Sequence, residues 1–156
     1  MNDNIKITGQ FNIRVVKDTE VIEEYTDNNM VLMTGRSALA HALASGQGTQ
    51  ITKIVLGTGG HDENNPTSAK EGLSVNDTGL IAPHTEKVLT DVTSLNNVLT
   101  IKATLASSEG LTGNAPTGFS EAALVLNNNA LFSIKRFGIK TKTADTSFEI
   151  TWKVTF

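Results

Sequence analysis

The 156-residue chain contains no cysteine, which excludes disulfide bonds, thiolate metal ligands and a cysteine nucleophile. Long apolar runs are also missing, because none approaches the roughly 18 residues that indicate a membrane-spanning helix. The N-terminal residues MNDNIKITG lack the basic start and apolar stretch of a secretory signal. We therefore expect a protein that is made in the cytoplasm of its producing cell and has no membrane partner.

Charged residues are scarce as well. Lys and Arg number 13 against 16 Asp and Glu, which gives a formal net charge of −3. Binding to a nucleic-acid backbone needs a clustered positive field, so we expect no nucleic-acid partner. The densest basic stretch contains Lys135, Arg136, Lys140 and Lys142. We interpret it as a solvated strand face or a subunit contact, with a phosphate-binding patch as the alternative.

Aromatic residues make up only 5% of the chain, and three of them stand in its last nine residues. From Phe148 to Phe156 every second residue is apolar and those between are polar. This is the pattern of a strand with one face in a core, so we predict that Trp152 is buried. Because the chain stops on such a strand, we expect no effector domain after it.

Shorter stretches of the same alternation predict further strands. They lie over 5–17, 98–105, 119–126 and 131–137, and residues 86–93 are expected to pair with 98–105 as a hairpin. Turn residues such as Asn, Asp and Gly separate them. Seven or eight strands at this spacing are typical of an antiparallel sandwich rather than a parallel sheet.

One segment has helical spacing instead. Leucine and alanine recur three and four residues apart over 35–45, Thr34 can cap the start, and Gly46 stands where a left-handed residue commonly ends a helix. The sequence therefore predicts a mainly β fold, a jelly-roll-like antiparallel β-sandwich with one short α-helix. It forms a single domain over residues 1–156.

Two long polar stretches, near 58–84 and 106–118, have weak periodicity and are predicted to be loops. Loops of this length in compact domains are usually functional or ordered by a partner. We expect residues 60–84 to be mobile in the free protein and better protected in an assembly. The candidate assembly contacts in this loop are His61, Asp62, Glu63, Asn64 and Asn65.

No constellation typical of catalysis is found. The glycine-rich stretch 57–60 follows a predicted strand, but a phosphate-binding loop also needs a Lys-Ser/Thr pair and a following helix, so we interpret it as a turn. Adjacent ligands such as His61, Asp62 and Glu63 rarely close one metal site. A Gly-x-Ser-x-Gly elbow is missing. We expect no enzyme, and no catalytic residue, metal or cofactor.

Glu121 stands out because the stretch around it, 119–125, is otherwise nearly all apolar. A buried carboxylate must be paired or hydrogen-bonded. Arg136, or its neighbour Lys135, lies across the turn at 127–129 and is the natural partner, which makes Glu121 and Arg136 a candidate structural ion pair. The alternative is an edge glutamate that points to water.

Several short motifs occur in a recognisable order. They are Thr34-Gly35-Arg36, Ile54-Val55-Leu56-Gly57-Thr58-Gly59, Ser120-Glu121-Ala122-Ala123-Leu124, Leu131-Phe132-Ser133-Ile134-Lys135-Arg136-Phe137 and Ile150-Thr151-Trp152-Lys153-Val154-Thr155-Phe156. This order resembles small structural proteins of tailed bacteriophages, including modules at the particle-proximal end of tail fibres. The likeness covers most of the chain, and it lies in the order of the motifs.

The resemblance implies a non-enzymatic virion component, made in the cytoplasm of the host bacterium, with other phage structural proteins as partners. We expect no receptor-binding fibre after Phe156, which favours a tail or fibre-attachment subunit or a baseplate adaptor over a complete fibre. A capsid decoration protein is the alternative. Symmetric particles need repeated copies, so we expect a homo-oligomer, with a trimer as one form. A carbohydrate-binding β-sandwich is a further alternative, but it needs exposed aromatic rings.

Overall fold

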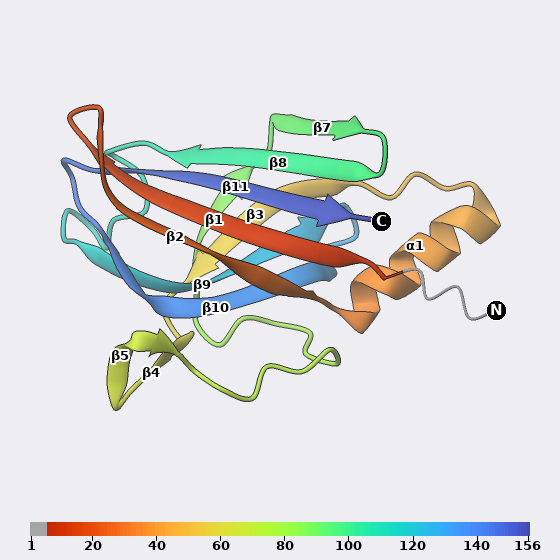
Figure 1. The fold of residues 1–156 in the computed structure, drawn as a ribbon, viewed down its shortest axis with the longest axis horizontal. Helices are drawn as coiled ribbons and strands as arrows, with labels where there is room; N and C mark the ends of the chain where they lie inside the picture. Colours follow the sequence, from red (N-terminus) through yellow and green to blue (C-terminus); the bar gives the residue numbers. More distant parts are fainter. Residues whose placement is uncertain (1–5) are drawn as a thin grey trace.

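The computed structural model describes residues 6–156, so the expected strand residue Ile5 lies outside the described residues. The elements follow one another (Figure 1) in the order β1 (Thr8–Lys17), β2 (Glu20–Val31), α1 (Met33–Ser45), β3 (Ile51–Gly57), β4 (His61–Asp62), β5 (Asn65–Ala69), β6 (Pro83–Val88), β7 (Asp91–Leu95), β8 (Val98–Leu105), β9 (Thr117–Leu126), β10 (Leu131–Lys142) and β11 (Ser147–Thr155). This part of the chain is mainly β with one helix, as the sequence predicts. It contains no helix with the length and apolar character needed to cross a membrane.

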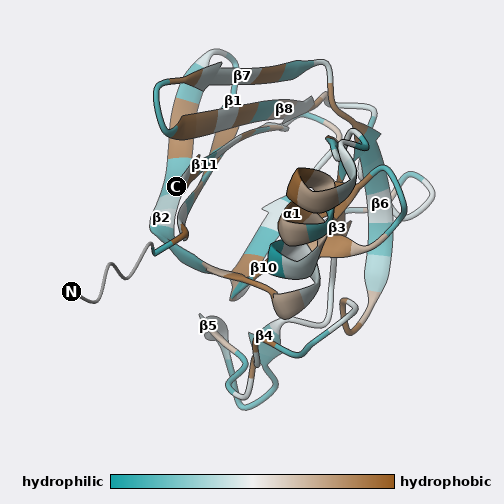
Figure 2. Cartoon of the chain, turned by 90° about the vertical axis from the view of Figure 1, so that its right-hand side faces the viewer, coloured by the Kyte–Doolittle hydropathy of each residue, from teal (hydrophilic) through white to brown (hydrophobic). Residues whose placement is uncertain are grey.

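Within residues 6–156, nine strands form one antiparallel sheet in the order β6-β3-β9-β10-β2-β1-β11-β8-β7. The sheet curls so that its two halves face each other, which gives the fold its β-sandwich-like character (Figure 2). The strands β4 and β5 form a separate short hairpin. The two edge strands of the large sheet, β6 and β7, follow each other in the chain and are joined only by Leu89 and Thr90.

This arrangement corrects the prediction that 86–93 is one strand of a hairpin with 98–105. The chain leaves β6 at Val88 and begins β7 at Asp91. β6 pairs with β3, whereas β7 alone pairs with β8. β3 and β8 lie near opposite edges of the sheet, and alternation within a short stretch does not reveal that the chain changes partner there.

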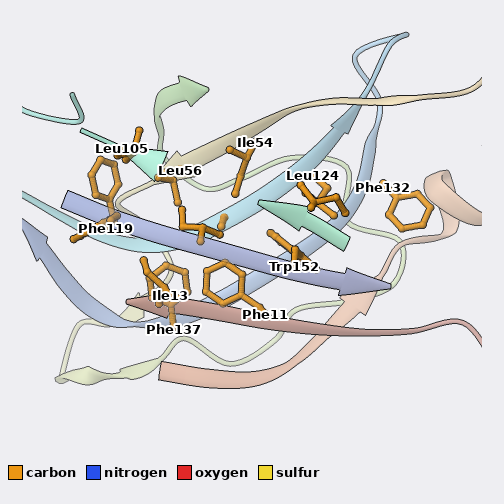
Figure 3. Packing of buried hydrophobic residues seen from close by; sticks show 14 of the residues in the cluster. Phe11, Ile13, Ile54, Leu56, Leu105, Phe119, Leu124, Phe132, Phe137 and Trp152 are labelled. Atoms are coloured by element: carbon orange, nitrogen blue, oxygen red, sulfur yellow. The ribbon is translucent and has the colours of Figure 1, made fainter. Parts of the chain in front are cut away.

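The core lies between the two halves of the curled sheet, and the alternating C-terminal strand supplies much of it. Trp152 on β11 is fully buried, as predicted. It lies opposite Phe11 of β1 in the register, and their rings meet edge to face at 4.9 Å. The same register places Thr8 beside Thr155. Figure 3 shows other buried side chains of this core: Ile13, Ile54, Leu56, Leu105, Phe119, Leu124, Phe132 and Phe137.

The central strand β9 does not alternate because both of its faces are covered. From Phe119 to Leu126 every residue is buried. The inner face lies in the main core, and on the outer face Ala123 belongs to a second apolar cluster, against which Leu73 and Leu80 pack. The segment between β5 and β6 therefore supplies a cover for β9, and this explains the unbroken apolar run there.

Helix α1 begins two residues before the predicted start. Its N-cap is Leu32, without a side-chain capping bond, and the Thr34 hydroxyl instead donates a hydrogen bond to the Leu131 carbonyl. The predicted end is confirmed, because Gly46 has a left-handed φ of 66° and donates its N–H to the Ala42 carbonyl. Gly35 is the buried residue of the helix. Figure 2 shows α1 in front of the space around which the sheet curls.

Candidate interaction surfaces

Glu121 is fully buried and binds backbone groups from two other segments. Its Oε1 accepts hydrogen bonds from the N–H groups of Gly59 at 3.2 Å and Ala82 at 2.7 Å. Its Oε2 accepts one from the N–H of Ile81 at 3.0 Å. Hydrogen bonds to a carboxylate are stronger than those between neutral groups, so Glu121 holds the turn after β3 and the entry to β6 against β9.

The predicted ion pair between Glu121 and Arg136 does not form. The alternative, a glutamate that points to water, is also wrong, because Glu121 is fully buried. Arg136 does lie opposite Glu121 in the register of β9 and β10. Its guanidinium, however, lies 3.7 Å from the Asp77 carboxylate and donates to the Glu71 carbonyl at 3.3 Å. Both side chains reach the segment between β5 and β6, which offers backbone donors to one and acceptors to the other. They thus bind the same overlying segment instead of each other.

The glycine-rich stretch 57–60 packs closely around Glu121. This agrees with its interpretation as a turn rather than a phosphate-binding loop. A Cβ on Gly57 would lie 2.6 Å from both the Ala82 carbonyl oxygen and Glu121 Oε1. The N–H of Gly60 donates to the buried Ser120 hydroxyl at 2.9 Å. Glycine is needed here because the backbones approach too closely for any larger side chain.

The predicted contact residues 61–65 lie together on the β4–β5 hairpin. His61 and Asp62 belong to β4 and are half-buried, Asn65 begins β5, and the exposed Glu63 and Asn64 form the turn. His61 Nδ1 lies 3.1 Å from the Ser120 hydroxyl, and Asp62 accepts the N–H of Asn64 at 2.9 Å. Within residues 6–156, no three His, Asp or Glu side chains come close enough together to hold a metal ion.

The range 58–84 is therefore more structured than the predicted polar loop. At the base of the hairpin the N–H of Lys70 donates to the Gly60 carbonyl at 2.8 Å. On its side, Thr67 packs so closely on Gly138 of β10 that a Cβ there would overlap the Thr67 carbonyl. Further along, the N–H of Met33 donates to the Val75 carbonyl at 2.7 Å. The second predicted loop, 106–118, ends where β9 begins at Thr117.

The basic stretch on β10 is paired with acids of β2, which favours its interpretation as a strand face over a phosphate-binding patch. Lys135 and Lys140 donate to Asp27 and Glu23, each at 2.7 Å. Their ammonium groups lie 5.8 Å and 5.4 Å from the ring centre of Tyr25. The hydrogen bond from Lys135 lowers the pKa of the Asp27 carboxyl, and burial raises the pKa of Tyr25 to about 12.

Lys142, the last basic residue of this stretch, is fully buried and points inward. Its ammonium donates to the carbonyls of Ser107 at 3.0 Å and Thr143 at 2.9 Å. Burial lowers the pKa of this lysine. The side chain thus joins the end of β10 to the loop before β9 and offers no charge to a ligand at the surface.

A second surface, which we call the apolar end, was missed in the sequence. It lies between α1, the link from β6 to β7 and the end of the chain, and it exposes 71% of Val88, 38% of Val92 and 40% of Phe156. A groove of about 550 Å³ opens there. Its lining consists of Leu39, Thr49, Gln50, Ile51, Thr52, Val88, Leu89, Thr90, Val92, Leu99, Leu126, Phe132 and Phe156.

The edge strand β7 borders this groove. All five of its residues, DVTSL, are exposed. The sequence does not show that β7 is an edge strand, because the same five residues could also form a central strand that pairs on both sides. The available signal is that the segment contains neither lysine nor proline, the residues with which edge strands are commonly protected.

Comparisons of the chain with known protein families, with curated proteins and with solved structures gave no match.

Proposed function

We propose that this chain is a non-enzymatic structural component of a tailed-phage virion, in the tail or fibre-attachment apparatus or as a baseplate adaptor. It acts through protein–protein assembly with other phage structural proteins and with further copies of itself. The observation that carries the proposal is the apolar end, where the unpaired edge of β7 lies beside an apolar groove.

The physical argument is the cost of leaving this surface in water. Val88, Val92 and Phe156 line the groove and are each more than one-third exposed, although apolar area gains roughly 25 cal/mol per Å² when it is removed from water. Exposed apolar side chains scattered singly are ordinary, but a group of them beside a groove is typical of an interaction site. A partner that covers the apolar end gains this free energy.

The virion context comes from the order of the sequence motifs, which is an association rather than a physical argument. The geometry bears on the carbohydrate-binding alternative. Sugar-binding sites stack the ligand on exposed aromatic rings, yet Trp152, Phe119 and Phe132 are buried in the core, and Phe156 is the single aromatic side chain among the exposed large hydrophobic residues of 6–156. The structure thus supports assembly better than sugar recognition. Capsid decoration uses the same kind of surface, and the two locations in the particle differ in copy number.

The test uses a phage that encodes this chain. Purified particles are probed for the protein, and its copy number is compared with the symmetry of the tail and of the capsid lattice. A double variant, Val88→Glu and Phe156→Glu, places charge on the apolar end and is expected to abolish incorporation. Ile22→Glu is the matched control, because Ile22 is also exposed but lies near the β1–β2 turn at the opposite end (Figure 1).

Three results decide the matter. If the double variant stays soluble but is missing from particles while Ile22→Glu is incorporated, the apolar end is the assembly surface. If the wild-type protein is absent from purified particles, the proposed function is wrong. A copy number that matches the capsid lattice would mean that the protein decorates the capsid and does not belong to the tail.

A further inference from the structure

The two edges of the large sheet differ in how they are protected. β6 begins at Pro83, contains the charged residues Glu86 and Lys87, and its pairing with β3 shifts in register between Leu56 and Gly57. Proline, charge and bulges are the devices by which natural sheets prevent a further strand from pairing. The β6 edge is therefore blocked.

The β7 edge has neither proline nor a bulge, and it has a single charge at its first residue. Its pairing with β8 runs without a register shift from Asp91 opposite Lys102 to Leu95 opposite Val98. The strand contains no proline and no lysine, and Asp91 is its single charged residue. Its free backbone N–H and C=O groups therefore form an open template for one more antiparallel or parallel strand.

We propose that β7 pairs with β7 of a second copy of this chain, antiparallel and centred on Thr93, so that the protein forms a two-fold dimer. This inference rests on the proposed assembly function, since it names the partner of the same surface. A two-fold contact uses one patch twice, so a single open edge is enough to build it and to close it.

The register follows from the faces of the strand. Val92 lies opposite the buried Ile101 of β8, so Val92 and Ser94 share the inner face, while Asp91, Thr93 and Leu95 share the outer face. A two-fold axis perpendicular to the sheet keeps inner residues opposite inner ones. Full overlap of the five-residue strand is then possible in only one way, with each Thr93 opposite the other copy's Thr93.

This register brings no like charges together. Asp91 faces Leu95 of the second copy, so the two Asp91 carboxylates lie at opposite ends of the paired strands, about 14 Å apart for four residues of strand. That separation exceeds the screening length of about 8 Å at physiological ionic strength. At the centre, a directly opposed Thr–Thr pair is a favourable cross-strand combination.

The apolar groove supplies the area that a short strand pair lacks. A five-residue strand is only about 17 Å long, whereas stable interfaces bury about 1,600 Å² in total. Val88, Leu89 and Val92 line the groove beside the inner face of β7. The second copy's Val92 and Ser94 lie on this same inner face, and they cover the groove as the strands pair.

The same contrast between edges favours a dimer over the trimer that the resemblance allows. A closed ring of three through the sheet edges would pair β7 of one copy with β6 of the next. The β6 edge is blocked by Pro83 and by the register shift opposite it. Pairing of β7 with itself avoids that edge.

Cross-linking tests the register directly, because the chain has no cysteine of its own. In Thr93→Cys the two thiols lie opposite each other, at a Cα separation of roughly 4.5–5.5 Å that suits a disulfide. Mild oxidation should therefore give a covalent dimer on a non-reducing gel. Leu95→Cys is the matched control on the same strand and face, and it should stay unlinked because its two copies lie about 14 Å apart.

Sedimentation of the purified full chain gives the oligomeric state. The wild type should sediment as a dimer, and Thr93→Lys, which sets two ammonium groups face to face, should sediment as a monomer. Thr26→Lys makes the same change at an exposed position of β2, between β1 and β10 in the sheet, and should remain a dimer. A monomeric wild type, or equal cross-linking of Thr93→Cys and Leu95→Cys, would overturn the inference.

The outcomes separate this inference from the proposed function. A wild type that is monomeric in solution, but whose Thr93→Lys variant is lost from particles, would show that β7 takes a strand of another virion protein. A dimer that never appears in purified particles would leave the β7 pairing in place and refute the virion assignment.

Discussion

A single carboxylate joins three parts of this chain. Glu121 on β9 accepts hydrogen bonds from Gly59 after β3 and from Ile81 and Ala82 before β6. All of these groups lose water when the segment closes over the sheet, and each would cost free energy if it were left unpaired. Glu121 therefore fixes the end of the β5–β6 segment next to β6, while Arg136 holds its earlier part.

Glu121→Gln should lower the free energy of unfolding by about 1–3 kcal/mol, because the amide nitrogen that replaces one oxygen cannot accept a hydrogen bond and leaves a buried N–H unpaired. Urea denaturation measures the change. Glu86→Gln is the control, since the Glu86 side chain is 62% exposed and surface ion pairs contribute little. Equal losses in the two variants would contradict the role given to Glu121.

Trp152 combines a packing role with a polar one. Its indole N–H donates to Asn29 Oδ1 at 2.8 Å, and the Asn29 amide in turn donates to the Ser133 hydroxyl. Trp152→Phe keeps an aromatic ring beside Phe11 but removes the donor to the Asn29 carbonyl, so we expect a loss of about 1–3 kcal/mol. Trp152→Ala should cost about 3–5 kcal/mol. Urea unfolding measures both, and an alanine variant as stable as the phenylalanine variant would contradict burial of the ring.

The position of the β4–β5 hairpin depends on a glycine. It packs on the outside of β10, where the register with β9 shifts between Arg136 and Lys140. Gly138 lies in this irregular stretch and touches the backbone of Thr67. Because the contact is to backbone, the hairpin has no side chain to move aside.

Gly138→Ala should therefore displace the hairpin. We expect faster hydrogen exchange over residues 61–69, unchanged exchange in β1 and β11, and a loss of about 1–3 kcal/mol, the usual range for an overpacked contact. Gly48→Ala is the matched control, since a Cβ there meets nothing within 4 Å. Unchanged exchange in the hairpin of Gly138→Ala would show that the hairpin is not fixed at this contact.

A pH-dependent contact joins β6 to the loop before β9. Lys87 donates to both carboxylate oxygens of Glu109 at 2.8 Å, and this hydrogen bond lowers the pKa of Glu109 below its ordinary value of 4.5. A carboxyl with a lowered folded-state pKa stabilises the fold above its unfolded pKa, and the contribution disappears as the pH falls through the folded value.

The wild type should thus be more stable than Glu109→Gln at pH values above 4.5, and the difference should shrink as the solution is made more acidic. Urea denaturation over a pH series from neutral to acid gives both curves. A difference that is constant over the whole series would mean that the charge of Glu109 does not contribute.

The sequence predicts those elements whose pattern is set by one buried face. The alternation of 148–156 identifies β11 and the burial of Trp152, and Gly46 identifies the end of α1. It does not predict the break at Leu89, because alternation does not reveal that the chain changes partner there. The apolar residues around Glu121 predict that it is buried. Its hydrogen-bond donors cannot be predicted, because they are backbone groups about 40 and 60 residues away in the sequence, and every residue type except proline has such a donor.

On the scale of the whole molecule, the two candidate contact surfaces lie on opposite sides. Figures 1 and 2 both show β7 at the top of the view and the β4–β5 hairpin at the bottom. A dimer formed through β7 would therefore turn both hairpins outward, away from the two-fold axis. In that arrangement residues 61–65 are available to other proteins while the apolar end is covered.

The pairing of β1 with β11 has a mechanical consequence. Thr8 at the start of β1 lies beside Thr155 at the end of β11, and hydrogen bonds in an antiparallel pair run perpendicular to the strands. A force applied at these two points therefore loads the hydrogen bonds between β1 and β11 one after another, in the unzipping geometry. In an optical-trap experiment the domain should yield at lower force from this pair of attachment points than when pulled from Thr8 and Ser147, whose separation along the strands loads the bonds together. A position that carries load would thus require attachment at opposite ends of the paired strands rather than at Thr8 and Thr155.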